Sequence, residues 1–539
     1  MLQTNIYKLK SNNYYVTLKN IDTNSTTRTP VHIVICLDMS GSMDMDDKYE
    51  NCKDSITFLL QFLNENDYIS FITFSDYSHI HMNKQNMSIN NKNKLKTILN
   101  TIQPNGSTNL SSALLDIHKC ITNETSSIKD GVIILTDGLI NMGIIEPTSL
   151  IKVVDNILEN YPLVTISTIG YGEDHNIDVL SDISNKGKGS YNYIKNREDT
   201  ATTFASLIGG LMSCTYTNTQ IEVPENITVK CSYNLSKTNI LQIGDIYVST
   251  DIDMILYQGD SISDTRSDIS DMSASGMAED EINTSTSSIP TIVNQINVST
   301  YNVKTHVHEI HGVTVHQATD TIEIDAEVCT IRELLGVYMK NINFNTITHY
   351  QKTEFIGNLD TLNKRLESLP DSIMKTCIIN EIIFVKDKLE NSSNALDSTA
   401  IFTQRYMNIG RGFTDTNDTY LSPIQREMTS AARTYCCTDA VTDAVTDTCE
   451  DPTSLKNSFT SSQKHVRYFG SFMQNQSGAD IRFKLPELPK LPESQTIIPT
   501  SNSFTNQNRR RERFQSFARS RSRSRSPAVK RSTTKRHNK

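Results

Sequence analysis

Four short, almost wholly apolar segments recur at intervals long enough to hold a helix, and they constrain the fold more than any other feature. They are VHIVICL (31–37), YISFITF (68–74), GVIILT (131–136) and LVTISTIG (163–170). Consecutive apolar residues are typical of strands buried on both faces of a parallel sheet. Amphipathic patterns between them predict helices at about 49–64, 108–121, 147–160, 176–185 and 198–212, with a weaker strand at 190–195. Residues 30–212 are therefore predicted to form a doubly wound, mostly parallel, Rossmann-like α/β domain.

The pattern changes after this domain. Apolar and polar residues alternate in much of 213–328, which predicts a β-rich, sandwich-like domain on which an N-terminal strand from residues 1–29 packs. A Ser- and Asp-rich stretch at 259–290 lacks periodicity and predicts a disordered insertion. Helical patterns return at 329–435. The chain is thus predicted to contain an α/β domain, a β domain and a helical region.

The C-terminal end is predicted to be a low-complexity linker, 436–508, and a disordered basic tail, 509–539. This tail holds 13 Lys and Arg and one acidic residue, a net +12, so the formal net charge of −9 leaves −21 on the rest. Arg and Ser alternate in it through Arg519, Ser520, Arg521, Ser522, Arg523, Ser524, Arg525 and Ser526. Such a stretch can contact nucleic acid or another anionic surface, or can be phosphorylated. A solvated tail without a specific partner is an equally open interpretation.

Cysteine usage and hydropathy predict the cellular context. The ten cysteines form no CxxC pair, so a RING or zinc-ribbon site is not predicted, and most stand in apolar surroundings typical of reduced, buried thiols. No apolar run reaches the roughly 18 residues of a membrane helix. The first residues lack the apolar stretch of a signal peptide. We therefore expect an intracellular protein, cytoplasmic or nuclear, without a membrane span.

Oxygen-bearing side chains follow two strands and open one helix of the predicted α/β domain. Asp38 ends the first strand, with Ser40 and Ser42 at alternate positions after it, while Asp137 follows the strand at 131–136 and Thr108 precedes a helix. Because parallel strands end at one edge of a sheet, these side chains are expected to meet there. Hard oxygens without thiol or imidazole select Mg²⁺, Mn²⁺ or Ca²⁺. The sequence thus predicts a divalent-cation site.

The set D-x-S-x-S, then G-S-T-N-L, then T-D-G resembles the metal-ion-dependent adhesion site (MIDAS) of von Willebrand factor A (VWA) domains. The resemblance implies that Ser40 and Ser42 ligate the metal directly and that Thr108 joins them when a ligand is bound. Asp38 and Asp137 are implied to act largely through water. It further implies a protein-binding module in which a partner's Asp or Glu completes the coordination. A metal that only stabilises the fold is the alternative.

The resemblance extends beyond the metal motif. Residues 166–213 resemble the closing half of VWA domains in inter-alpha-trypsin-inhibitor heavy chains and in plant and protist RING-type proteins. Residues 404–432 resemble the end of the VWA-interacting region of the latter group. RING cysteines are missing here, so ligase activity is not implied, and a ubiquitin-pathway scaffold stays an alternative. The Asn-, Ile- and Lys-rich composition resembles that of giant-virus proteins, which would make a virion location possible.

Two further clusters admit a metal but have simpler interpretations. In THVHEIHGVTVH (305–316), His306 and His308 are expected on one polar strand face rather than in a transition-metal site. Asp44, Asp46 and Asp47 are expected to favour the N-terminus of the following helix rather than to form a Ca²⁺ site.

Catalytic motifs are not apparent. The sequence lacks a G-x-S-x-G elbow, a P-loop and an H-E-x-x-H pair. A D-x-D-x-T phosphatase needs a second acid two residues after the first, where this chain has Ser40. We therefore predict no enzymatic activity. A protein associated with nucleic acid through its tail is the main alternative to the metal-dependent module.

Overall fold

The computed structural model describes residues 2–21, 28–121, 128–195, 197–224, 229–231, 234–258, 294–391, 394–409 and 421–447. The insertion predicted at 259–290 and the basic tail, including Arg519 to Ser526, lie outside these residues. The domain boundaries given above therefore stay a proposal.

A six-stranded sheet forms the first part of the structure, with the order β5-β4-β3-β6-β7-β8. Its strands are β3 (Val31–Asp38), β4 (Tyr68–Phe74), β5 (Ser78–Asn86), β6 (Lys129–Thr136), β7 (Thr165–Tyr171) and β8 (Lys188–Ile194). All neighbours pair in parallel except β5, which runs antiparallel to β4 at the edge. The predicted α/β class is confirmed.

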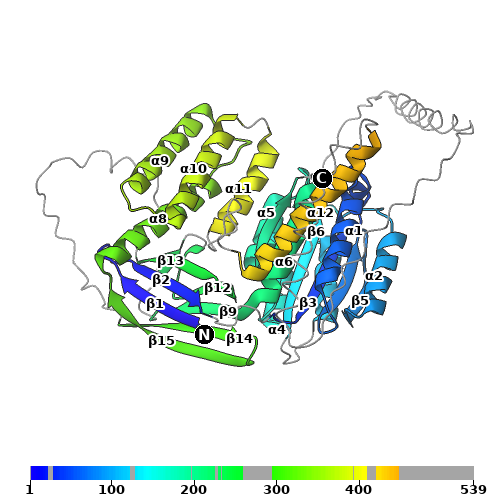
Figure 1. The fold of residues 1–539 in the computed structure, drawn as a ribbon, viewed down its shortest axis with the longest axis horizontal. Coiled ribbons are helices and arrows are strands. Elements are labelled where there is room, and N and C mark those ends of the chain that lie inside the picture. Colours follow the sequence, from blue (N-terminus) through cyan, green and yellow to red (C-terminus); the bar gives the residue numbers. More distant parts are fainter. Residues whose placement is uncertain are drawn as a thin grey trace, which may run out of the picture. The chain divides into compact units, whose positions relative to one another are not determined.

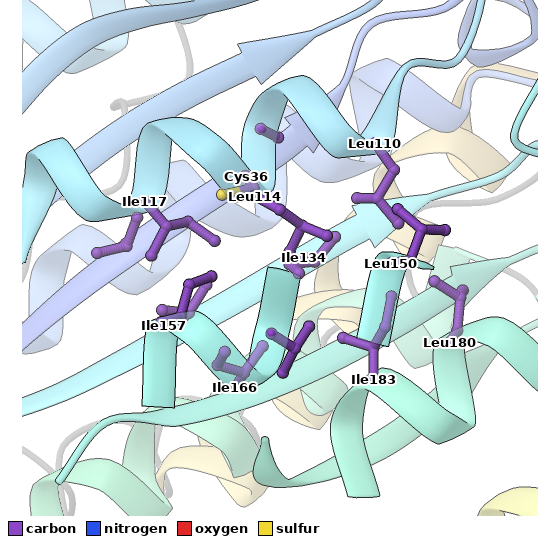
Figure 2. Close-up of a cluster of buried hydrophobic side chains, with 14 of the residues drawn as sticks. Cys36, Leu110, Leu114, Ile117, Ile134, Leu150, Ile157, Ile166, Leu180 and Ile183 are labelled. Atoms are coloured by element: carbon purple, nitrogen blue, oxygen red, sulfur yellow. The ribbon is translucent and has the colours of Figure 1, made fainter. Parts of the chain in front are cut away.

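Helices cover both faces of this sheet. They are α1 (Lys48–Leu59), α2 (Ile89–Thr101), α3 (Leu110–Cys120), α4 (Pro147–Asn160), α5 (Ile177–Lys186) and α6 (Arg197–Ser213). The helices α3, α4 and α5 bury apolar residues against β3, β6 and β7, as Figure 2 shows for Leu114, Ile157 and Ile183. The helices α1 and α6 contact one another, and α6 packs on β3 and β6. Neither β5 nor α2 was among the predicted elements.

Helix α3 illustrates how the local sequence sets these elements. The side chain of Asn109 accepts a hydrogen bond from the backbone N–H of Ser112 at 3.2 Å and so caps the first turn. Leu110, Leu114 and Ile117 recur at the spacing of one helix face, and all three are fully buried. The cap fixes where the helix begins, and the apolar face fixes how it lies on the sheet.

A second sheet has nine strands in the order β11-β10-β13-β2-β1-β15-β14-β9-β12. They are β1 (Leu2–Lys8), β2 (Tyr14–Asn20), β9 (Cys214–Glu222), β10 (Val229–Cys231), β11 (Asn234–Thr238), β12 (Ile240–Tyr247), β13 (Asp251–Gln258), β14 (Gln295–Asn302) and β15 (Val307–Gln317). Strands that are distant in this order, such as β12 at one end and β10 next to the other end, bury side chains in one apolar cluster. Because β2 and β9 belong to the same sheet, the α/β part is inserted between two of its strands.

Helices form the remainder of the described chain. They are α8 (Asp320–Lys340), α9 (His349–Glu367), α10 (Ile373–Asn391), α11 (Ala395–Ile409) and α12 (Pro423–Asp447). The helices α8 to α11 share an apolar core, whereas α12 lies along α6 (Figure 1). Helix α12 continues past residue 435, where the linker was predicted to begin.

Two further expectations concern cysteines and membrane helices. Cys36, Cys52, Cys120, Cys214, Cys329 and Cys377 are buried free thiols, as their apolar surroundings predicted. Within the described ranges, no helix combines the length and apolar character needed to cross a membrane.

Candidate metal centre

The ends of β3 and β6 bring the two predicted carboxylates to one edge of the sheet. These strands are parallel neighbours, with Leu37 opposite Leu135, so Asp38 and Asp137 emerge side by side. Thr136 donates its hydroxyl hydrogen bond to Asp38 across the strands. Both carboxylates are buried. The topology thus joins two acidic residues that are about a hundred positions apart in the chain.

Asp38 fixes the turn that carries the two serines. Its carboxylate accepts a hydrogen bond from the backbone N–H of Ser40 at 2.7 Å. Burial raises the pKa of Asp38 to about 6, although the hydrogen bonds from Thr136 and Ser40 favour the charged form. Asp38 is therefore a buried acid held in place by the residues around it.

The hydroxyls of Ser40 and Ser42 meet the second carboxylate. Their Oγ atoms are 3.1 Å apart, and the Ser42 hydroxyl donates to Asp137 Oδ1 at 2.7 Å. The three side chains therefore form one hydrogen-bonded group whose acceptors are all oxygen atoms.

Thr108 reaches the same group beside Gly138. A Cβ atom built on Gly138 would lie 3.2 Å from Thr108 Oγ1 and 3.5 Å from Ser42 Oγ. Both hydroxyls therefore border the backbone that follows Asp137. A glycine at 138 keeps the space between them open, because a side chain there would enter it.

The loop before Thr108 is held by two residues that the sequence analysis did not identify. Asp76 follows β4 at the same edge, and its Oδ1 accepts from the backbone N–H of Ser107 at 2.8 Å. Asn141 Oδ1 accepts from the N–H of Thr108 at 2.9 Å. A third acid after a predicted strand was a usable signal for Asp76, whereas nothing in the sequence distinguished Asn141.

Lys48 is a further residue that sequence reasoning missed. Its ammonium donates to Asp137 Oδ2 at 2.6 Å, and the two side chains are 11% and 0% exposed. Lys48 is the first residue of α1 and lies ten positions after Asp38. A cation therefore already lies beside the carboxylate of the candidate site.

The chemistry of these side chains suits a hard divalent cation. Ser40, Ser42 and Thr108 could offer neutral hydroxyl oxygens, and Asp38 and Asp137 could offer carboxylates. Asp137 already pairs with the Lys48 ammonium, so a cation at this site would share that carboxylate with the lysine.

The other predicted clusters are not arranged for metal binding. In the described ranges, no group of three His, Cys, Asp or Glu side chains could hold an ion. The expectation that His306 shares a strand face with His308 is wrong, because His306 lies in the turn before β15 with a positive φ of 59°. Asp47 is the N-cap position of α1, but its side chain makes no capping hydrogen bond, and Asp44, Asp46 and Asp47 are exposed.

Comparisons with known proteins agree with the fold. Residues 32–206 match the family model of the von Willebrand factor type A domain. The uncharacterized protein YfbK of Escherichia coli is 30% identical over 167 residues, which cover 30% of this chain and 28% of that protein. Human inter-alpha-trypsin inhibitor heavy chain H3 is 26% identical over 217 residues, which cover 38% of this chain and 24% of that protein. The chain thus spans about a quarter of the length of these two relatives.

Among solved structures, a von Willebrand factor type A protein from Catenulispora acidiphila aligns with 76% of this chain and 96% of its own, at 12% identity and a TM-score of 0.49. The assignment rests on the family match and on the sheet described above. Residues 32–206 therefore form a VWA domain, with inter-alpha-trypsin inhibitor heavy chains among its relatives.

Proposed function

We propose that this chain is a non-enzymatic interaction module whose VWA domain binds a divalent cation and, through it, a carboxylate of a protein partner. Mg²⁺ is the first candidate, and Mn²⁺ or Ca²⁺ are the others. The contact among Ser40, Ser42 and Asp137 gives this proposal its main support, because it gathers hydroxyls and a carboxylate from two strand ends. Catalysis is not proposed, since Ser40 stands where a phosphatase of the D-x-D-x-T kind would need its second acid.

Each side chain would have a distinct role. Ser40, Ser42 and Thr108 would hold the cation through their hydroxyls, which carry no charge. Asp38 and Asp137 would supply the negative charge, and Asp38 also fixes the serine turn through the Ser40 N–H. When bound, the cation would offer an electrophilic position that a partner's Asp or Glu can occupy.

The loops that carry these residues also expose apolar side chains. Met45 follows the serine turn, Leu139 follows Asp137, and Tyr77 follows Asp76; all three are exposed large hydrophobic residues. We call them the apolar rim. A partner segment that presents its acidic residue among apolar side chains would match this surface.

Affinity capture with and without Mg²⁺ tests the proposal. The full-length wild type should retain partners in Mg²⁺ and lose them in EDTA, and Ser40→Ala/Ser42→Ala should lose them in both conditions. Ser181→Ala/Ser368→Ala is the matched control, because each of these hydroxyls donates to a backbone carbonyl three residues earlier in its own helix. Retention of the same proteins by the site variant in EDTA would refute the metal-dependent module.

The same captures separate the proposal from a second candidate, which the charge of the tail supports. If the Arg–Ser stretch from Arg519 to Ser526 binds nucleic acid, that binding should survive EDTA and fall steeply with salt. Capture of ubiquitin or its conjugating enzymes would instead indicate a ubiquitin-pathway scaffold.

A further inference from the structure

Lys48 places a buried positive charge against the candidate metal centre. Its ammonium nitrogen is 2.6 Å from Asp137 Oδ2, while Asp137 Oδ1 accepts from Ser42. With both side chains almost fully shielded from water, this ion pair differs from the exposed pairs elsewhere on the chain. Buried charges are tolerated when paired, so each of the two keeps the other in place.

The surroundings hold the lysine in this position. Gly172, in the loop after β7, has a φ of 72°, and a Cβ atom there would lie 3.7 Å from Lys48 Cε and 3.8 Å from Nζ. The end of the lysine side chain is thus covered by backbone on one side and faces Asp137 on the other. The positive φ at 172 favours glycine, and the loop lies within ordinary van der Waals distance of the end of the Lys48 side chain.

We propose that Lys48 is a built-in counter-ion that occupies Asp137 in the metal-free protein and competes with the divalent cation for it. This inference rests on the proposed function. An ammonium that neutralises one of two carboxylates halves the negative charge available to a cation at the site. Metal affinity is thereby kept low until a partner contributes a further carboxylate, so metal and partner bind cooperatively.

The proposal predicts that Lys48→Met lowers the stability of the metal-free protein but raises its affinity for Mg²⁺. In EDTA, the variant leaves a buried carboxylate without its partner, so its thermal unfolding midpoint should fall by about 5 °C or more. In calorimetric titration with Mg²⁺ alone, its Kd should be lower than that of the wild type by about tenfold or more. A residue with a merely structural role would weaken metal binding rather than strengthen it.

Lys53→Met is the matched control, because Lys53 lies on the same helix and pairs with the exposed Glu50. It should change neither the EDTA midpoint by more than about 2 °C nor the Mg²⁺ affinity by more than about twofold. Lys48→Gln removes the charge while keeping a hydrogen-bond donor, and it serves if Lys48→Met fails to fold.

The outcomes distinguish this inference from the proposed function. A wild type that binds Mg²⁺, together with Lys48 variants that bind it equally or more weakly, overturns the counter-ion proposal alone. If neither wild type nor variants take up Mg²⁺, Mn²⁺ or Ca²⁺, the metal-dependent function itself is refuted. In that case, an unchanged EDTA midpoint for Lys48→Met would refute the ion pair as well.

Discussion

Burial decides the charge preference of several acidic side chains in this chain. Glu333 in α8 is fully shielded, and its Oε1 accepts from the backbone N–H of Ile255 at 2.9 Å. Burial raises the pKa of Glu333 to about 7, against the opposing effects of that hydrogen bond and of Arg332. The folded state therefore favours the protonated form of this carboxyl group up to neutral pH.

We expect Glu333→Gln to alter how stability depends on pH. The pKa of Glu333 is raised on folding from an ordinary value of 4.5. Its contribution is therefore fully present below about pH 4.5 and is lost as pH rises through about 7. As pH rises from about 5 to about 8, the free energy of unfolding of the variant should therefore increase by about 3 kcal/mol relative to that of the wild type.

Urea unfolding at several pH values measures this difference. Other buried groups change stability with pH in the opposite direction. Burial lowers the pKa of His175 to about 4, for example, so its contribution increases stability as pH rises. These contributions are the same in both proteins and do not affect the difference between them. Glu367→Gln, at an exposed position on α9, is the matched control for the loss of a carboxyl group. Equal slopes for the wild type and Glu333→Gln would contradict the expectation.

Residues at the candidate site differ in how far the sequence could identify them. Asp38, Ser40 and Ser42 stand in one short motif, and the strand-end rule placed Asp137 beside them. Lys48 could not be predicted, because it precedes the apolar face of α1 and its partner is nearly ninety positions away. No periodicity or motif spacing in the sequence indicates such a long-range ion pair.

At the level of elements, the degree of burial explains which parts of the fold the sequence predicted. The strands β3, β4, β6 and β7 are buried on both faces and therefore read as apolar runs. The edge strand β5 is mostly polar and only Met82 is fully covered in it. Helix α2 buries only Leu95 and Leu99 within an Asn- and Lys-rich segment. Neither pattern differs enough from a loop to be predicted.

The packing of α12 on α6 gives a prediction at this scale. A Cβ atom on Gly209 would lie 2.9 Å from the Cα atom of Gln425, so the two helices approach through backbone. Gly209→Ala should separate them and lower the free energy of unfolding by about 1–2 kcal/mol, even though alanine favours helix. Hydrogen exchange of 423–435 should become faster in the variant.

Gly357→Ala on α9 supplies the control, because nothing in the described chain lies within 4 Å of a Cβ atom built there. We expect little change in the exchange of 423–435 in this variant. Faster exchange of 423–435 in Gly357→Ala than in Gly209→Ala would show that the close backbone approach does not govern the packing of α12.

At the scale of the whole molecule, the VWA domain and the second sheet are joined by more than the chain connections. Lys129 at the start of β6 directs its ammonium to Asp245 of β12 at 3.0 Å, and both side chains are almost fully buried. The hydroxyls of Thr165 and Thr217 and the carbonyl of Leu163 lie within 2.9 Å of the same nitrogen. This polar cluster ties strands of the two sheets together in the interior.

We expect Lys129→Met to uncouple the two sheets. Removing the ammonium leaves Asp245 as a buried charge without its partner, which costs about 3–5 kcal/mol. Calorimetry should show one cooperative transition for the wild type and two for the variant, because the VWA domain then unfolds apart from the second sheet. The double variant Lys129→Met/Asp245→Asn should recover about 1–2 kcal/mol of the loss, since both charges of the pair are then removed together. Lys386→Met removes a partly exposed pair with Asp360 and should cost at most about 1 kcal/mol. If Lys129→Met costs no more than this control, the two sheets are held together by apolar packing and not by the buried ion pair.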